Sequence, residues 1–331
     1  MLSQARYMGN FAEFLVRRRA NVRTDLEALS ELERRGAELA SGGLATGGLA
    51  LPPGLELQWL GVSGYRLTYE RQTLFIDPYV SRVSLRDALT RRMALPDPAL
   101  VKRYLDRPVG ERVLAVLVGH THFDHALDAP ALALRHGCPA YGSESLAALL
   151  RLHRLPESQV VTVTPHRRYE IGPFTVTFIP SVHSKLVLGW RVPMDGELSC
   201  DHLDGMSAGA YRCGRVYAIL IEVAGVRLYH QGSSNLLDDE VPGGGVDLFL
   251  AGVAGRGFTE RYWQRILTRL QPRVVVPTHY DDFFRPLDAE PGLTLNVRLA
   301  RVPEEVANVS DSITVAALPV NEVLSGAGPS R

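Results

Sequence analysis

Cysteine, lysine and net charge are all scarce in this chain of 331 residues. The three cysteines, Cys138, Cys200 and Cys213, form no C-x-x-C pair, which argues against a structural thiolate site and suits a reducing cytoplasm. Lys+Arg and Asp+Glu number 36 each, so no long-range field favours nucleic acid as a partner. Lys102 and Lys185 are the only lysines, which indicates compositional bias rather than mechanism.

Long hydrophobic runs are also missing. No continuous apolar stretch is long enough to span a bilayer, and the first residues lack the charged-then-apolar pattern of a secretory signal. We therefore expect a cytoplasmic protein without a transmembrane segment. With 46% hydrophobic residues, the chain is long enough to bury a large core.

The first 53 residues are predicted to form a helical arm and a linker. Residues 3–19 place Met8, Phe11 and Phe14 on one helical face, which would pack on the domain or join a second subunit into a homo-oligomer. Alternatively, this helix could bind to a membrane surface. Thr24 and Glu27 form a capping box that predicts a second helix beginning at Thr24. The catalytic domain would then span 54–331, including a C-terminal extension.

The segment His120-Thr121-His122-Phe123-Asp124-His125 places three imidazoles and one carboxylate within six residues. It follows the apolar run 113–118, which predicts a buried strand, so the cluster lies where a strand ends. This spacing favours two neighbouring metal seats, and the nitrogen and oxygen donors suit Zn²⁺, Fe or Mn. The alternative is a histidine-rich turn without metal.

Three further strand ends carry polar residues of the same kind. Predicted strands at 74–76, 175–179 and 274–276 lead into Asp77-Pro78, into His183 and into His279. Together with the histidine cluster, they resemble the metallo-β-lactamase-fold superfamily over roughly residues 54–285. That resemblance implies an α/β fold, a four-layer αββα sandwich with an N-terminal helical extension.

The resemblance also implies ligands for one or two divalent ions, with Zn favoured. Such ions lie about 3.5–4 Å apart when two are present. Asp77 is expected to accept a hydrogen bond from a ligand histidine, although a structural Asp-Pro turn would account for it equally. The implied ligands are His120, His122 and His183 for one ion, and Asp124, His125 and His279 for the other.

Ser233 departs from the family pattern. It follows the strand-like segment 226–229 where relatives commonly supply a bridging aspartate, so the site loses one negative charge. The second ion could be weak or absent, or solvent and substrate alone could bridge two ions. Asp238 or Asp239 could also fold back as a replacement. His230 could approach the ions, or could support the site from the protein core.

The remaining chain is predicted to surround this site. Two short helices within 83–106 could form a pocket wall, Ser143 and Thr259 could cap two others, and residues 184–215 form a long irregular loop. Candidate substrate contacts in this loop are Lys185, Trp190 and Arg191 and, as individually weak candidates, Asp195, Asp201, His202, Asp204 and Tyr211.

The sequence thus predicts a metal-dependent hydrolase in which a metal-bound hydroxide cleaves an ester-like bond. Asp124 is the candidate catalytic residue, since it could ligate metal, orient the hydroxide and carry a proton. The motif pattern is most similar to the branch with ascorbate-phosphate lactonases and N-acyl-phosphatidylethanolamine phospholipases, so a small or lipid-like lactone or phosphodiester is expected. The alternative is a non-catalytic, metal-containing binding protein with a degenerate site.

Overall fold

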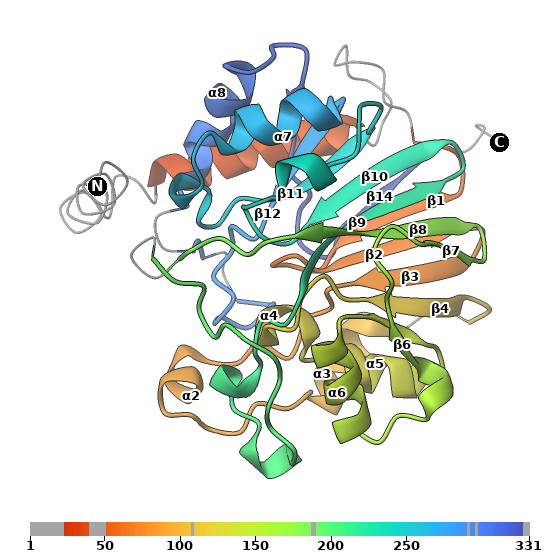
Figure 1. Cartoon of the computed structure of the whole chain (residues 1–331). Coiled ribbons are helices and arrows are strands. Elements are labelled where there is room, and N and C mark those ends of the chain that lie inside the picture. Colours follow the sequence, from red (N-terminus) through yellow and green to blue (C-terminus); the bar gives the residue numbers. More distant parts are fainter. Residues whose placement is uncertain are drawn as a thin grey trace.

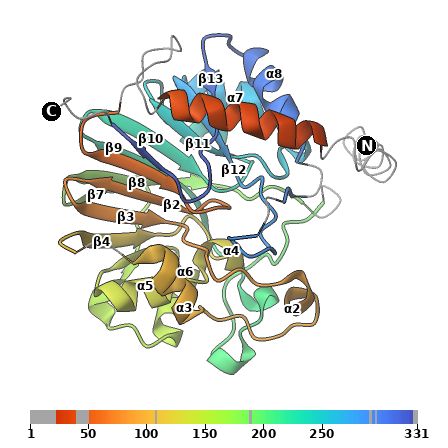
Figure 2. The ribbon, with the colours of Figure 1, turned by 180° about the vertical axis from the view of Figure 1, so that it is seen from behind.

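Two β-sheets packed face to face, with helices on both outer sides, form the body of the protein (Figure 1). The computed structural model describes residues 23–39, 51–106, 109–186, 190–289, 292–294 and 297–326. Within these residues the order of layers is helix, sheet, sheet, helix, and the view from behind shows the same order (Figure 2). The four-layer αββα sandwich predicted from the sequence is therefore confirmed.

The first sheet has seven strands within the described part of the chain, in the order β14-β1-β2-β3-β4-β5-β6. Its antiparallel half is a meander from β1 to β3, whereas β3 to β6 run parallel and are joined by helical crossovers. The strands are β1 (Leu55–Trp59), β2 (Tyr65–Tyr69), β3 (Gln72–Ile76), β4 (Arg112–Leu117), β5 (Ala140–Gly142), β6 (Val160–Thr162) and β14 (Val323–Ser325).

The second sheet repeats this plan, with the described strands in the order β13-β12-β11-β10-β9-β8-β7. A hairpin around Gly172 joins β7 to β8, and the strands before the Ser233 turn are β9 and β10. The strands are β7 (Arg168–Ile171), β8 (Phe174–Ser181), β9 (Val216–Val223), β10 (Val226–Gln231), β11 (Leu248–Gly252), β12 (Val274–Thr278) and β13 (Thr314–Val315).

One helical layer covers the outer face of the first sheet. Leu132 and Leu149 of this layer pack with Phe75 and Val116 of the sheet in one buried cluster. Ser143 caps its helix as predicted, because the hydroxyl accepts a hydrogen bond from the Leu146 N–H. The helices on this side are α2 (Leu85–Leu89), α3 (Pro98–Leu105), α4 (Phe123–Ala126), α5 (Ala129–His136) and α6 (Glu144–Leu152).

The opposite side of the molecule carries α7 (Tyr262–Leu270), α8 (Val302–Ala307) and the helix of residues 23–39 (Figure 2). The last of these already includes Arg23, so the prediction that Thr24 caps it is wrong. Thr259 does not cap α7 either. Its hydroxyl donates to the Ser234 carbonyl oxygen, and Arg261 occupies the cap position in the left-handed region.

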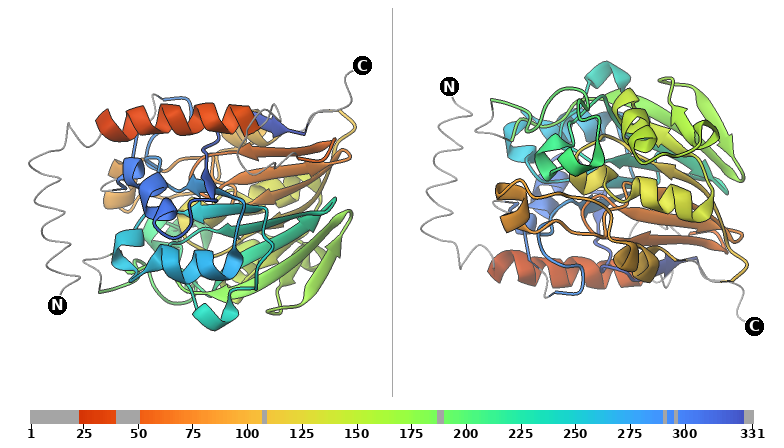
Figure 3. Two further views of the ribbon diagram at one scale, coloured as in Figure 1. Left: turned by 90° about the horizontal axis from the view of Figure 1, so that it is seen from above. Right: turned by 90° about the horizontal axis from the view of Figure 1, so that it is seen from below.

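The helix of residues 23–39 packs against the C-terminal part of the chain (Figure 3). Leu29 and Leu32 belong to the main buried cluster, and the Ala317 N–H donates to the Leu32 carbonyl oxygen at 2.9 Å. A Cβ on Gly36 would lie 1.9 Å from the Ala317 oxygen, so only glycine permits this approach. The boundary at residue 53 remains a prediction, and residues 3–19 lie outside the described part.

The C-terminal extension completes both sheets. Strand β14 pairs with β1 at the edge of the first sheet, and β13 pairs with β12 at the edge of the second. Among the described residues, no helix has both the length and the apolar character to cross a membrane.

Candidate metal centre

Six buried side chains from three strand ends meet at one edge of the sandwich. His120, His122, Asp124 and His125 lie in the loop after β4 and in the short α4, whereas His183 follows β8 and His279 follows β12. Because each of these strands runs toward the same edge, residues far apart in sequence arrive side by side. The structure therefore brings together all six candidate ligands.

His120, His122 and His183 form the first triad, whose candidate ligand atoms all lie within 4.8 Å of one another. Nε2 of His120 lies 3.1 Å from Nδ1 of His122. One nitrogen of His122 and one of His183 already have hydrogen-bond partners. His122 Nε2–H donates to the Pro193 carbonyl oxygen at 2.8 Å, and His183 Nδ1–H donates to the Ser184 carbonyl oxygen at 2.8 Å. These bonds fix the ring orientations, so His122 Nδ1 and His183 Nε2 remain to face an ion.

Asp124, His125 and His279 form the second triad, again with ligand atoms within 4.8 Å. Asp124 Oδ2 lies 3.2 Å from His279 Nε2 and 3.7 Å from His125 Nε2. The two triads adjoin, because the His120 and His125 ring centroids are 3.9 Å apart. The geometry thus matches two neighbouring metal-binding positions rather than a single closed coordination site.

A divalent ion fits this donor set. Nε2 of His125 is buried and has no hydrogen-bond partner among the described residues, although its Nδ1 is fixed by a carboxylate. A buried imidazole nitrogen without a partner costs free energy, and an ion would satisfy it. Five imidazoles and one carboxylate suit Zn²⁺, Fe or Mn, and they do not distinguish among these metals.

Asp77 ties the strand ends together beneath the second triad. Its Oδ1 accepts a hydrogen bond from the Gly119 N–H at 2.7 Å, and its Oδ2 lies 2.9 Å from Nδ1 of His125. A Cβ on Gly232 would lie 3.0 Å from this carboxylate, so the Ser233 turn packs closely here as well. The contact expected of Asp77 with a candidate ligand histidine is therefore present.

Burial keeps the first triad neutral. Desolvation, reinforced by the neighbouring imidazoles, lowers the pKa of His120 well below its usual value and that of His183 to about 3. Burial also lowers the pKa of His122 to about 4, although the Asp124 carboxylate partly opposes the shift. Ion binding requires neutral imidazole, so these rings are prepared for it at neutral pH.

Opposite charges dominate the second triad. Burial lowers the pKa of His125, but the carboxylates of Asp124 and Asp77 outweigh it, so the pKa is raised. Burial raises the pKa of Asp124, yet the adjacent His125 and His279 outweigh it and the pKa falls. Asp124 is therefore ionised, as a ligand or as a proton acceptor must be.

Ser233 sits in the turn after β10, where the missing aspartate was expected. Its Oγ accepts a hydrogen bond from the Ser184 N–H at 3.0 Å, so it contacts the residue next to His183. Asp238 does not replace the missing carboxylate, because it pairs with Arg265 at 2.6 Å. Asp239 is fully exposed and pairs with Arg269. The alternative of a returning aspartate is therefore wrong.

His230 belongs to the core beside the site rather than to either triad. Its Nε2–H donates to the Ser63 carbonyl oxygen at 2.9 Å, and burial lowers its pKa. The same nitrogen lies 3.8 Å from Asp77 Oδ2, so His230 packs behind the carboxylate that holds His125.

The irregular loop of residues 184–215 passes over the first triad through the Pro193 contact with His122. Lys185, Trp190 and Arg191 of this loop are exposed. Their role as substrate contacts stays a prediction. Tyr211 is fully buried and donates its hydroxyl to the Ala94 carbonyl oxygen. The prediction that Tyr211 contacts substrate is therefore wrong.

Three supporting residues had no recognisable signal in the sequence. The Val62 carbonyl oxygen accepts from the His279 N–H at 2.7 Å, and the Val62 N–H donates to Asp281 Oδ1 at 2.9 Å. Asp281 Oδ2 in turn pairs with the buried Arg82 at 2.9 Å. Val62 and His279 both have positive φ, at 53° and 59°, so the network holds strained backbone at the metal centre.

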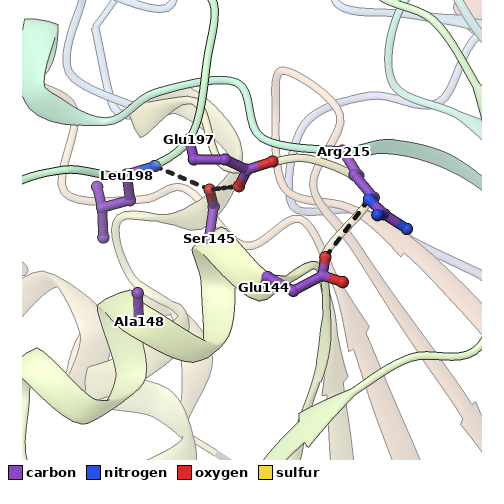
Figure 4. A pocket seen from close by; sticks show the side chains of 6 residues that line it. All are labelled: Glu144, Ser145, Ala148, Glu197, Leu198 and Arg215. Atoms are coloured by element: carbon purple, nitrogen blue, oxygen red, sulfur yellow. Dashed lines mark hydrogen bonds and ion pairs between the residues drawn. The ribbon is translucent and has the colours of Figure 1, made fainter.

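A hollow of about 360 Å³ lies away from the metal centre, between α6 and the irregular loop (Figure 4). Ser145 Oγ bonds Glu197 and accepts from the Leu198 N–H, and Arg215 pairs with Glu144 across its rim. Its charged side chains pair with one another or with Ser145, and none of the six candidate metal ligands lines the hollow.

The structure defines an αββα protein with two adjoining clusters of candidate metal ligands, and comparison with known proteins shows the family to which it belongs. The family profile of the beta-lactamase superfamily domain matches residues 56–279, so the chain belongs to that superfamily. The resemblance noted in the sequence is confirmed.

Curated relatives include a UPF0173 metal-dependent hydrolase from Polaromonas sp., 26% identical over 247 residues, covering 68% of this chain and 77% of the relative. Another, from Cupriavidus taiwanensis, is 29% identical over 238 residues, covering 68% of this chain and 74% of the relative. Their names agree with the expected enzyme class.

Solved structures support the fold alone. YhfI of Bacillus subtilis, a metallo-beta-lactamase fold protein, aligns with a TM-score of 0.51 and 15% identity over 81% of this chain and 98% of its own. CmlA of Streptomyces venezuelae, a diiron beta-hydroxylase, aligns with a TM-score of 0.54 and 16% identity over 83% of this chain and 55% of its own.

Proposed function

We propose that this protein is a metal-dependent hydrolase that cleaves an ester-like bond, with a lactone or a phosphodiester as the favoured substrate class. The observation that carries the proposal is the convergence of two buried triads, with neutral imidazoles in one and an ionised carboxylate in the other. The names of the curated relatives support the same class.

The triads would hold one or two divalent ions, with zinc favoured over iron or manganese. A divalent ion bound there lowers the pKa of a water molecule toward about 7 and polarises the bond to be broken. His120, His122 and His183 would hold one ion, and Asp124, His125 and His279 the other. Asp77 and His230 would keep the His125 ring in place from behind.

Asp124 is the proposed catalytic residue. Its ionised Oδ2 lies between the two histidines of its triad and could orient the attacking water. During attack the same carboxylate would take the proton that the water loses, and it could then pass this proton to the leaving oxygen. His279 Nε2, at 3.2 Å from Asp124, would keep the carboxylate aimed during this transfer.

Substrate binding would fall to the irregular loop. Lys185 and Arg191 are exposed cations on the segment between His183 and Pro193, and they could pair with an anionic group of the substrate. Trp190, 60% exposed, could cover an apolar part of it. The choice of lactone or phosphodiester rests on the resemblance of the metal motifs to those branches. A small or lipid-like molecule would fit both.

The three unpaired cysteines suit a reducing compartment, and we place the protein in the cytoplasm. A non-catalytic metal-binding role is the second candidate, because Ser233 stands where a bridging carboxylate is expected.

Separate His122→Ala and His183→Ala variants test the proposal. We expect both to lose bound metal, measured by elemental analysis, and to lose turnover on lactone, phosphodiester, thioester and acyl-ester substrates. His166→Asn is the control, because His166 is exposed, pairs with Glu240 and lies outside the irregular loop. Retained hydrolysis with unchanged metal content would exclude this mechanism. If the unaltered protein binds metal but turns over none of these substrates, the result would favour the binding role.

A further inference from the structure

Helix α2 exposes apolar side chains to solvent, although the segments before and after it are fixed. None of its five residues is buried, and Leu85 and Leu89 are 50% and 75% exposed. These two residues are four apart, so they share one helical face. Met93, 57% exposed, follows shortly after the helix ends. Exposed apolar side chains that lie near one another mark an interaction surface more often than exposed apolar side chains that are scattered singly.

The segments on both sides of α2 are fixed. Before the helix, Val80 and Ser81 donate backbone N–H groups to the buried Asp128 at 2.6 Å and 2.8 Å. After it, the Ala94 N–H donates to the Met206 carbonyl oxygen at 2.7 Å. The helix is therefore held in place. Asp87 pairs with Arg92 and Ala88 packs against the core, whereas Leu85 and Leu89 stay exposed.

This position adjoins the metal centre from two directions. Arg82, two residues before the α2 cap, pairs with Asp281, which follows His279 by two residues. On the other side, α2 and the turn after it contact residues 207–210 of the irregular loop, which passes over His122 through Pro193. Figure 1 and the view from behind in Figure 2 place α2 beside this loop.

The charges around the apolar side chains select the partner. Residues 85–93 contain Arg86, Arg91 and Arg92 against the single Asp87, in a chain whose formal charge is zero. All three arginines are exposed. A second copy of the same surface would bring arginines against arginines. The basic N-terminal stretch Arg17-Arg18-Arg19 would be repelled in the same way, so the partner should be anionic.

We propose that α2 and the turn after it, residues 85–93, dock this protein on a phospholipid bilayer with anionic headgroups. Leu85, Leu89 and Met93 would enter the boundary between headgroups and acyl chains, and the arginines would pair with the phosphates. Docking here would place the irregular loop that contacts His122 near the bilayer surface, and the proposal does not depend on the hydrolase activity.

Vesicle flotation of the full chain tests the proposal. We expect binding to vesicles of phosphatidylcholine mixed with phosphatidylglycerol, weaker binding to pure phosphatidylcholine, and weakening of the first by salt. The triple variant Leu85→Ser, Leu89→Ser, Met93→Ser should lose binding, and Arg86→Glu with Arg91→Glu should weaken it at least about tenfold. Because every substituted side chain is exposed, both variants should keep the circular dichroism and melting temperature of the unaltered protein.

Two matched controls show whether residues 85–93, rather than another apolar part of the chain, bind the vesicles. Leu134→Ser removes an exposed leucine from α5 and should leave vesicle binding unchanged. Phe11→Ser with Phe14→Ser alters the amphipathic N-terminal stretch, and a loss of binding there but not in the triple variant would overturn the proposal. Absence of binding to the anionic vesicles would do so too. A dimer that the triple variant alone converts to monomer would assign the surface to a second copy instead.

Discussion

Oδ2 of Asp77 lies 2.9 Å from Nδ1 of His125, and both side chains are fully buried. The carboxylate directly follows β3 and the imidazole belongs to α4, so this contact joins the end of a strand in the first sheet to the helix after β4. It sets which nitrogen of His125 faces Asp124 and His279, and it is therefore the contact on which the second triad depends.

Replacing Asp77 with Asn should weaken metal binding at the second triad. The amide would keep the shape of the side chain but remove the charge that favours the His125 orientation, and we expect affinity to fall by about 10–100-fold. Isothermal titration with zinc would measure this, with Asp239→Asn as an exposed control. Unchanged affinity for both ions would show that Asp77 serves only to hold the Gly119 turn.

Ser233→Asp should strengthen the binding of a second ion. The new carboxylate would replace the serine oxygen next to Ser184 and add the missing negative charge, so we expect affinity for the second ion to rise by about tenfold or more. Ser233→Asn is the matched control, because it has the same shape without the charge. Equal metal stoichiometry and affinity in both variants would mean that position 233 lies outside the reach of the ions.

Acid should destabilise the metal-free protein through His183. Its pKa is about 3 when folded and near 6.5 when unfolded, so below pH 6.5 the unfolded chain takes up a proton that the folded chain refuses. Stability is therefore lost as the pH falls from 6.5 toward 3. Relative to metal-free His183→Gln, the free energy of unfolding should drop by roughly 3 kcal/mol between pH 7 and pH 4.

This comparison isolates one residue. The raised pKa values of His125 and Asp128 act in the opposite direction, because those groups are more protonated when folded, but they are present in both proteins and cancel. Urea denaturation at each pH would measure the difference. Parallel pH profiles for the two proteins would contradict a neutral, buried His183.

Asp281→Ala should destabilise the fold far more than a surface substitution does. The side chain of Arg82 is only 3% exposed, so removal of its partner leaves a buried cation, at a cost of about 3–5 kcal/mol. Asp288→Ala breaks an exposed pair with Arg103 and should cost less than about 1 kcal/mol. Chemical denaturation of both variants would check this, and equal losses would show that the buried pair contributes no more than the exposed one.

The sequence predicted the parts of this site that depend on local order. A buried strand followed by His120-Thr121-His122-Phe123-Asp124-His125 specifies ligands at a strand end, because a strand and the turn after it fix side-chain direction over a few residues. His183 and His279 follow their own strands in the same way. The cap at Ser143 was predicted correctly for the same reason. Those at Thr24 and Thr259 were not, because Thr24 lies inside its helix and the Thr259 hydroxyl donates to the Ser234 carbonyl oxygen.

Only the tertiary structure decided which groups support those ligands. The bond of His122 to Pro193, the Val62–His279 contact and the Arg82–Asp281 pair each join segments about 70 to 220 residues apart, and no local spacing encodes them. It also decided that Asp238 faces Arg265 and that Tyr211 is buried. Local sequence thus determined the fold family and the six candidate ligands. The path of the long loop determined the orientation of the His122 ring, because the contact of this ring with Pro193 exists only once the chain has folded.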